Sequence, residues 1–409
     1  MDLFHLISIL VVLSALFAYI NFRFIKLPGT IGLMAVSLFF SILILLSGQL
    51  LSPFKNMVGE MLVTIDFSEL LLEGMLSFML FAGAIPIKYE DLKSEKRSIF
   101  FFSTVSVIIS TFIVGISTYF LFSLFGIRIS LINALLFGAL ISPTDPIAVL
   151  SILKNAGISK SLETKIAGES LFNDGVAVVV FLTILQLAKP GAELDAGNIL
   201  LLFGQEAVGG IILGILLGYI GYLLFVSINN YKVEVLITLA IVMGGYTLAH
   251  YIHVSGPLAM VIAGLITGNH GKKLGMSQMT AEYVDKFWEL ADDILNTVLF
   301  VLIGMEVLII KTSSTMIIIG ILLIIIVLIS RFISVWLPSV VIRLRETIPR
   351  RALIILTWGG LRGGISIALA LSVPVNLNRD ILVTVTYIIV CFAILVQGLT
   401  INKVARMKL

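Results

Sequence analysis

The chain has 409 residues, of which 59% are hydrophobic and only 12% are charged. A soluble domain is about 45–50% apolar and about 25% charged, so the composition excludes an ordinary soluble protein and indicates a membrane protein with many spans. The net charge of +3 adds little, because the position of charge matters more than its sum. The single cysteine, Cys391, allows no intramolecular disulfide and is interpreted as a small buried hydrophobe.

A window of about 19 residues, the length that crosses the hydrocarbon layer, predicts thirteen spans. The first has no basic segment before it and no cleavage pattern after it, so we interpret it as a retained helix. The ninth is short and the tenth begins with a polar segment. We expect a single transmembrane domain over residues 1–409 and no soluble domain. The approximate limits are 3–20, 30–47, 67–86, 98–122, 131–153, 163–188, 201–226, 235–252, 256–270, 284–309, 315–340, 351–373 and 381–402.

The basic residues predict the orientation of these spans. If the N-terminus is outside, 20 lysines and arginines fall on the inner side and 5 on the outer side. Because inner loops of membrane proteins carry an excess of lysine and arginine, we expect an outside N-terminus and a cytoplasmic C-terminus. Two arginines, Arg331 and Arg362, lie within spans.

The fifth span is interrupted by the sequence ISPTDP, residues 141–146. Pro143 and Pro146 bracket Thr144 and Asp145, and each proline lacks an N–H and disfavours helix in the residue before it. The backbone is therefore predicted to unwind at the carboxylate. Unwound backbone at membrane depth is tolerated only where it is buried in protein or lines a watery cavity, and a broken helix with an acid is typical of a cation site in a transporter.

The twelfth span contains a second interruption, WGGLRGG, in which four glycines within six positions weaken the helix. If the span at 201–226 is a connector, each break lies in the fifth of six spans, in the halves at about 3–188 and about 235–402. The two halves enter the membrane from opposite sides. The sequence therefore predicts an all-α fold with an inverted repeat of six plus six spans, whose discontinuous helices cross at the substrate site.

Two acids lie inside apolar segments: Asp145 at the first break and Asp174 in the sixth span. Such an acid costs about 2.5–3.5 kcal/mol on insertion scales and is functional by default, although a carboxylate that caps a half-helix is the structural alternative. Ser170 and Asp174 share one helix face at i and i+4. Because hard cations prefer oxygen ligands, we predict a cation site made by Asp145, Asp174, the Ser170 hydroxyl and the Thr144 carbonyl or hydroxyl.

Other polar residues in the membrane are interpreted as supporting the site. Asn173 is expected to hold the broken span to the sixth span through its amide rather than to bind the ion directly. Arg331 needs a buried acid, and Glu169 is the best candidate for an ion pair that holds the core. Arg362, between the glycines of the second break, offsets the half-helix dipoles or binds backbone carbonyls.

Two further acids, Asp292 and Asp293, come near the start of the tenth predicted span. They cap a helix near the inner surface or form a funnel that attracts cations. The sequence does not distinguish between these alternatives.

The predicted site implies exchange without enzymatic chemistry. A proton and a metal cation compete for the same oxygens, and the two acids titrate as a pair. Alternating access of a site that holds one or the other, but not both, produces antiport. A sodium-coupled symporter of an organic solute and a passive cation channel are the alternatives of other classes.

Five motifs carry a family resemblance: SPTDPIAV, GESLFNDGVAVVVF, HVSGPLAMVIAGL, LFVLIGMEVL and WGGLRGGISIALAL. In order along the predicted spans, they resemble those of the monovalent cation:proton antiporters of the NhaP and NHE type. The resemblance implies a homodimer in the lipid of a prokaryotic cytoplasmic membrane that exchanges Na⁺, often Li⁺, for H⁺. It implies no cofactor and no nucleic-acid partner.

Residue by residue, the resemblance implies ion binding by Asp145, Asp174, Thr144 and Ser170, and an ion bridge between Glu169 and Arg331. The order Asn173–Asp174 implies electroneutral one-for-one exchange, because relatives with aspartate first are associated with electrogenic exchange. One position departs from the family pattern. Many relatives carry an acid in the third span where this chain has Ala82, which leaves K⁺/H⁺ exchange on the same fold as an alternative.

Overall fold

The computed structural model describes residues 3–47, 67–145, 147–189, 196–310, 312–342 and 349–406. Nine helices within these ranges are long and apolar enough to cross a membrane. The other predicted spans correspond to the two broken helices, a short helix that begins at Gly256 and a long helix whose first turns are polar. The predicted all-helical, multi-pass membrane fold is thus confirmed.

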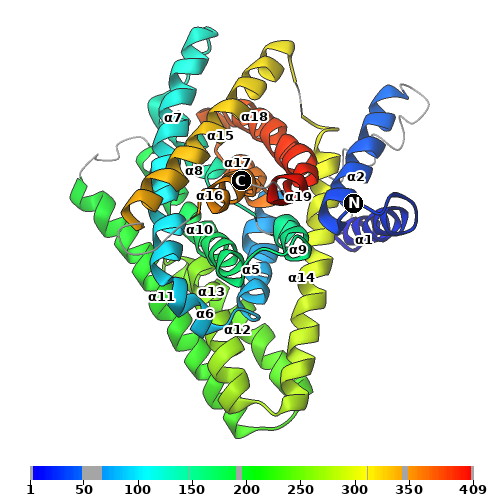
Figure 1. Ribbon diagram of the computed structural model, residues 1–409, viewed down its shortest axis with the longest axis vertical. Helices are drawn as coiled ribbons and strands as arrows, with labels where there is room; N and C mark the ends of the chain where they lie inside the picture. The colour runs from blue at the N-terminus through cyan, green and yellow to red at the C-terminus, as the bar shows by residue number, and fades with distance from the viewer. Residues whose placement is uncertain are drawn as a thin grey trace.

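The helices form two bundles, whose members pack mainly within their own bundle. Each bundle combines spans from both halves of the chain (Figure 1). The first bundle contains α1 (Leu3–Ile20), α2 (Gly29–Leu46), α5 (Leu76–Ala84), α11 (Ala196–Ser227), α12 (Tyr231–Tyr251), α13 (Gly256–Ile266) and α14 (Gln278–Glu306). The second contains α6 (Tyr89–Phe100), α7 (Ser106–Leu124), α8 (Leu131–Ile141), α9 (Ile147–Asn155), α10 (Lys160–Leu187), α15 (Ser314–Ile342), α16 (Arg350–Trp358), α17 (Gly364–Ser372), α18 (Arg379–Phe392) and α19 (Gly398–Arg406).

Short irregular helical segments extend or join several of these helices. They are α4 (Phe67–Glu69) and η2 (Leu70–Met75) before α5, η1 (Asn21–Ile25) after α1, η3 (Phe101–Val105) between α6 and α7, η4 (Thr267–Gly275) after α13, η5 (Val375–Leu377) before α18 and η6 (Ala393–Gln397) between α18 and α19. The third predicted span is therefore assembled from α4, η2 and α5 rather than from one uniform α-helix.

Serine caps fix where several helices begin, because a side-chain oxygen at this position accepts a hydrogen bond from a free N–H of the first turn. Ser159 caps α10, Ser255 caps α13 and Ser277 caps α14. Since α14 begins at Gln278, Asp292 lies deep within the helix. The alternative in which Asp292 and its neighbour cap a helix start is therefore wrong.

The two broken helices cross in the second bundle. The first consists of α8 and α9, and the second of α16 and α17, and all four lie near the middle of the view in Figure 1. At the crossing, the Asp145 N–H donates a hydrogen bond to the Leu361 carbonyl at 2.9 Å, the contact of an isolated antiparallel bridge. The predicted crossing of discontinuous helices is confirmed. Pro146 of the predicted proline pair and segments 48–66 and 190–195, which lie between predicted spans, are outside the described residues.

Candidate cation-binding site

Helix α10 buries its polar residues against the first break. Glu169, Ser170 and Asn173 are buried, and Asp174 is 9% exposed. Polar groups at this depth need partners, and the unwound segment between α8 and α9 supplies them. The polar face of α10 that the helical spacing predicts therefore packs against the unwound backbone of the first break.

Thr144 is the residue through which α10 holds that backbone. The Asn173 Nδ2 donates to the Thr144 Oγ1 at 2.8 Å, and the Asn173 Oδ1 accepts from the Thr144 N–H at 3.5 Å. The Ser170 hydroxyl donates to the Thr144 carbonyl. A hydroxyl that has donated its hydrogen still has lone pairs, so the Ser170 oxygen can also accept a cation.

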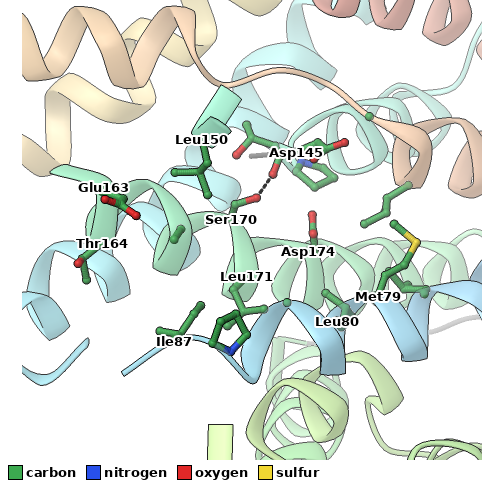
Figure 2. A pocket seen from close by; sticks show the side chains of 18 of the residues that line it. Met79, Leu80, Ile87, Asp145, Leu150, Glu163, Thr164, Ser170, Leu171 and Asp174 are labelled. Carbon is green, nitrogen blue, oxygen red and sulfur yellow. Dashed lines mark hydrogen bonds between the residues drawn. The ribbon is translucent and has the colours of Figure 1, made fainter. Parts of the chain in front are cut away.

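A cavity of about 290 Å³ brings the four predicted ligands together. Asp145 and Thr144 from the first break, and Ser170 and Asp174 from α10, all line it. Figure 2 shows Asp145, Ser170 and Asp174 grouped on one side of this cavity. The two carboxylates are close enough to interact electrostatically. An acid pair with two neighbouring neutral oxygens is an arrangement that suits a hard cation.

Part of the cavity lining is apolar and belongs to the first bundle. Leu76, Met79 and Leu80 from α5 and Leu299 from α14 line it, and Figure 2 shows Met79 and Leu80 beside Asp174. The cavity therefore lies at the interface of the two bundles. Movement of one bundle against the other would change access to the acids, because the lining comes from both bundles.

The cavity opens on a charged side of the protein. Its lining there includes two ion pairs, Lys154–Glu163 at 3.0 Å and Lys160–Asp91 at 2.8 Å. These residues are exposed or partly exposed, and Figure 2 places Glu163 away from Asp174. All four lie on the side that the basic residues predict to be cytoplasmic.

A buried ion pair lies behind the site. The Glu169 carboxylate and the Arg331 guanidinium are 2.5 Å apart, with 3% and 6% of their side chains exposed. Arg331 also donates to the Leu356 carbonyl near the end of α16 at 3.0 Å. This arginine connects α10 to the second broken helix, and Gly360 leaves space for it, because a Cβ there would lie 2.6 Å from Nε.

Arg362 in the second break is turned toward the first. Its Nη1 donates to the Ser142 and Pro143 carbonyls, at 2.5 and 2.8 Å. These carbonyls follow the C-terminal end of α8, where backbone acceptors lack helical partners and the helix dipole is negative. The sequence offers two roles for Arg362, offsetting a half-helix dipole or binding backbone carbonyls. This one contact does both.

A second, wider cavity of about 880 Å³ lies nearby and is lined by several further acids. Asp292 and Asp293 line it together with Glu289, Lys272 and Lys273. The funnel interpretation of the two aspartates therefore remains a prediction. Ala82 lines this wider cavity but not the cavity with the acid pair. An acid at this position would thus face the wider cavity rather than the cavity that Asp145 and Asp174 line.

Sequence reasoning missed two lining residues of the narrower cavity, Gly363 and Ser366. Both follow Arg362, at the start of α17. Gly363 belongs to the glycine pattern that marks the second break, but a single serine in an apolar helix forms no pattern of its own. The only signal in the sequence is that a crossing of the two breaks must bring the start of α17 close to Asp145.

Comparisons with known proteins identify the family of the chain. The family model described as sodium/hydrogen exchanger, transmembrane, matches residues 12–406. The chain is 47% identical to the Na⁺/H⁺ antiporter NhaP of Pseudomonas aeruginosa over 98% of this chain and 96% of that protein. It is 33% identical to the Na⁺/H⁺ antiporter NhaH of Halobacillus dabanensis over 83% of each.

A solved structure supports the fold. The sodium proton antiporter MjNhaP1 from Methanocaldococcus jannaschii superimposes with a TM-score of 0.80 over 99% of both chains, at 19% sequence identity. At this identity the match shows only that the fold is the same, whereas the family model and the relatives show that the chain belongs to the family. The chain belongs to the transmembrane sodium/hydrogen exchanger family.

Proposed function

We propose that the protein is a secondary active antiporter that exchanges Na⁺ or Li⁺ for H⁺ across a prokaryotic cytoplasmic membrane. The observation that carries the proposal is that Asp145 and Asp174 line one cavity together with the oxygens of Ser170 and Thr144. The names of the relatives, which are Na⁺/H⁺ antiporters, support it. No covalent chemistry is needed, so the protein acts as a transporter and not as an enzyme.

In this mechanism the two carboxylates hold one cation or one proton by turns. A cation takes oxygens of Asp145, Asp174, Ser170 and Thr144 when the acids are ionised. Protonation removes the negative charge that retains the cation and releases it. The Glu169–Arg331 pair and the contacts of Asn173 with Thr144 keep the broken backbone in place while the site changes occupant. With a cytoplasmic C-terminus, the cavity described here opens toward the cytoplasm.

We infer one-for-one, electroneutral exchange. The Asn173 side chain is neutral and already bonded to Thr144, so Asp145 and Asp174 are the two carboxylates of the proposed ligand set, and residue 173 adds no third one. A cation with one positive charge then exchanges for one proton. The order of asparagine and aspartate in the family resemblance points the same way.

The test is a flux assay in proteoliposomes with a pH-sensitive dye. Added Na⁺ should cause proton movement in the wild-type protein, and Asp174→Ala should abolish it. Asp380→Asn is the matched control, because that carboxylate is exposed at the start of α18 and far from the cavity lining. Full activity of Asp174→Ala would remove the proposal. An imposed voltage that leaves the wild-type rate unchanged would support electroneutrality.

Potassium/proton exchange is the second candidate, because Ala82 replaces an acid that many relatives carry. The apparent affinities for Na⁺, Li⁺ and K⁺ in the same assay decide between the two. A preference for K⁺ over Na⁺ would favour this alternative. Exchange in the absence of any organic solute would exclude the symporter, and a requirement for bound protons would exclude the passive channel.

A further inference from the structure

Ser366 on α17 has a hydroxyl with no protein partner among the described residues. The residue is 1% exposed, and its Oγ makes no hydrogen bond to any of them. It nevertheless lines the cavity that contains Asp145 and Asp174. An unpaired buried hydroxyl costs about 1–3 kcal/mol, so a buried hydroxyl beside a cavity points to a ligand in that cavity.

The place of Ser366 in its helix explains why the usual partner is missing. A helical serine commonly donates to the carbonyl three or four residues earlier, and Ser372 on the same helix does so, to the Leu369 carbonyl at 2.9 Å. Ser366 is the third residue of α17, which begins at Gly364. The carbonyls four and three residues earlier belong to Arg362 and Gly363, which precede the helix, and the Ser366 Oγ bonds to neither of them.

A second observation places Ser366 on the side of α17 that faces Asp145. Gly363 is the N-cap of α17, and a Cβ at that position would lie 2.6 Å from the Asp145 Oδ2. The Asp145 carboxylate therefore occupies the space of an N-cap side chain. Such a side chain faces the third residue of the helix, which is Ser366.

We propose that Ser366 is a further oxygen ligand of the transported cation, contributed by the second broken helix. The proposal rests on the exchange function proposed above. It makes the site a product of both breaks: Asp145 and Thr144 come from the first, Ser366 from the second, and Ser170 and Asp174 from α10. The hydroxyl lone pairs supply a neutral ligand, and they add no charge that would alter the stoichiometry.

The test compares Ser366→Ala with wild type in proteoliposomes over a series of Na⁺ and Li⁺ concentrations. Loss of one neutral ligand, at about 0.5–1.5 kcal/mol, should raise the apparent KM for the cation about 2- to 10-fold. The maximal rate at saturating cation should stay close to wild type. Ser366→Thr keeps the hydroxyl and should restore the wild-type KM. Ser372→Ala is the matched control on the same helix, because its hydroxyl is bonded to its own backbone.

A binding measurement keeps the test independent of transport. Bound cation stabilises the folded protein by mass action, so NaCl should raise the melting temperature of the detergent-solubilised protein relative to choline chloride. Ser366→Ala should shift the half-maximal NaCl concentration upward by the same factor as KM. If Ser366→Ala does not fold, Ser366→Cys replaces the oxygen by sulfur at nearly constant shape, and the same shift is expected.

Two outcomes separate this proposal from the exchange function. A wild-type protein with no cation-dependent proton movement would overturn the exchange function itself. An active wild-type protein whose Ser366→Ala or Ser366→Cys variant keeps an unchanged KM and an unchanged NaCl midpoint would overturn only the role of Ser366. A lower maximal rate at unchanged KM would also overturn it, since that result indicates a structural role.

Discussion

The two helix breaks carry opposite charges: Asp145 between α8 and α9, and Arg362 between α16 and α17. Both must satisfy backbone carbonyls where a half-helix ends inside the protein. At α8 these carbonyls accept from Arg362, and near the end of α16 the Leu356 carbonyl accepts from Arg331. Each half-helix end is thus covered by an arginine from another part of the chain.

The breaks differ in what their own charged residue faces. Arg362 is buried and bonded to protein carbonyls, whereas Asp145 is partly exposed and lines the cavity. A charged side chain that is bonded only to the protein stabilises the fold. A charged side chain that faces a cavity can bind one ion and then another. We infer that Arg362, the charged residue of the second break, has a structural role and that Asp145 of the first break belongs to the working site. The following variants test that division.

The largest effect is expected for Asp145→Asn. Asparagine has nearly the same shape, and the backbone N–H of this residue still bonds to Leu361, so the fold should persist. Loss of one of the two carboxylates that hold the cation, at about 3 kcal/mol, corresponds to about a 100-fold loss of cation affinity. Proton movement on addition of Na⁺ should disappear in proteoliposomes, while the melting temperature stays near wild type. Retained exchange would contradict the assignment of the first break as the working site.

The next effect concerns stability and not transport. Glu169→Gln leaves Arg331 buried without its acid, and breaking one side of such a pair costs about 3–5 kcal/mol. The double variant with Arg331→Met removes both charges and should recover part of this loss. Thermal unfolding in detergent measures both variants. The single variant should melt well below wild type, and a double variant that melts lower than the single one would show that the pair does not act as a unit.

Several of these relationships could be predicted from the sequence, and others could not. Prolines and glycines mark both breaks locally, because their backbone effects need no tertiary context. The buried arginine in the eleventh span, Arg331, needs an acidic partner, and Glu169 is that partner. The contact of Arg362 with Ser142 depends on the register in which two helices cross, which no local pattern encodes. The start of α14 at Gln278 could not be predicted either, because the polar first turns of this helix resemble a loop.

Gly363→Ala tests how closely the second break fits the first, with a smaller expected effect than Asp145→Asn. The new Cβ would lie 2.6 Å from the Asp145 Oδ2 and 2.7 Å from its Cβ, so Asp145 must move. We expect the apparent cation affinity to fall about tenfold, or about 1.4 kcal/mol, in the flux assay. Gly204→Ala is the control, because a Cβ there meets nothing within 4 Å. Equal behaviour of the two variants would show that the start of α17 does not position Asp145.

The smallest effect on rate and stability is expected for Asn173→Asp, which instead should change the charge moved per cycle. An aspartate can still accept from the Thr144 N–H, and the Thr144 hydroxyl can rotate and donate to it in place of the lost amide donor. The contacts between residue 173 and Thr144 should therefore persist and keep the first break in place, while a third carboxylate joins the site. The exchange rate should then respond to an imposed voltage to which wild type is indifferent. Asn133→Asp adds an acid to the far end of α8, where the amide bonds to Asn378, and should leave the voltage response at the wild-type level. If Asn173→Asp is equally indifferent to voltage, the number of acids around Thr144 does not set the stoichiometry.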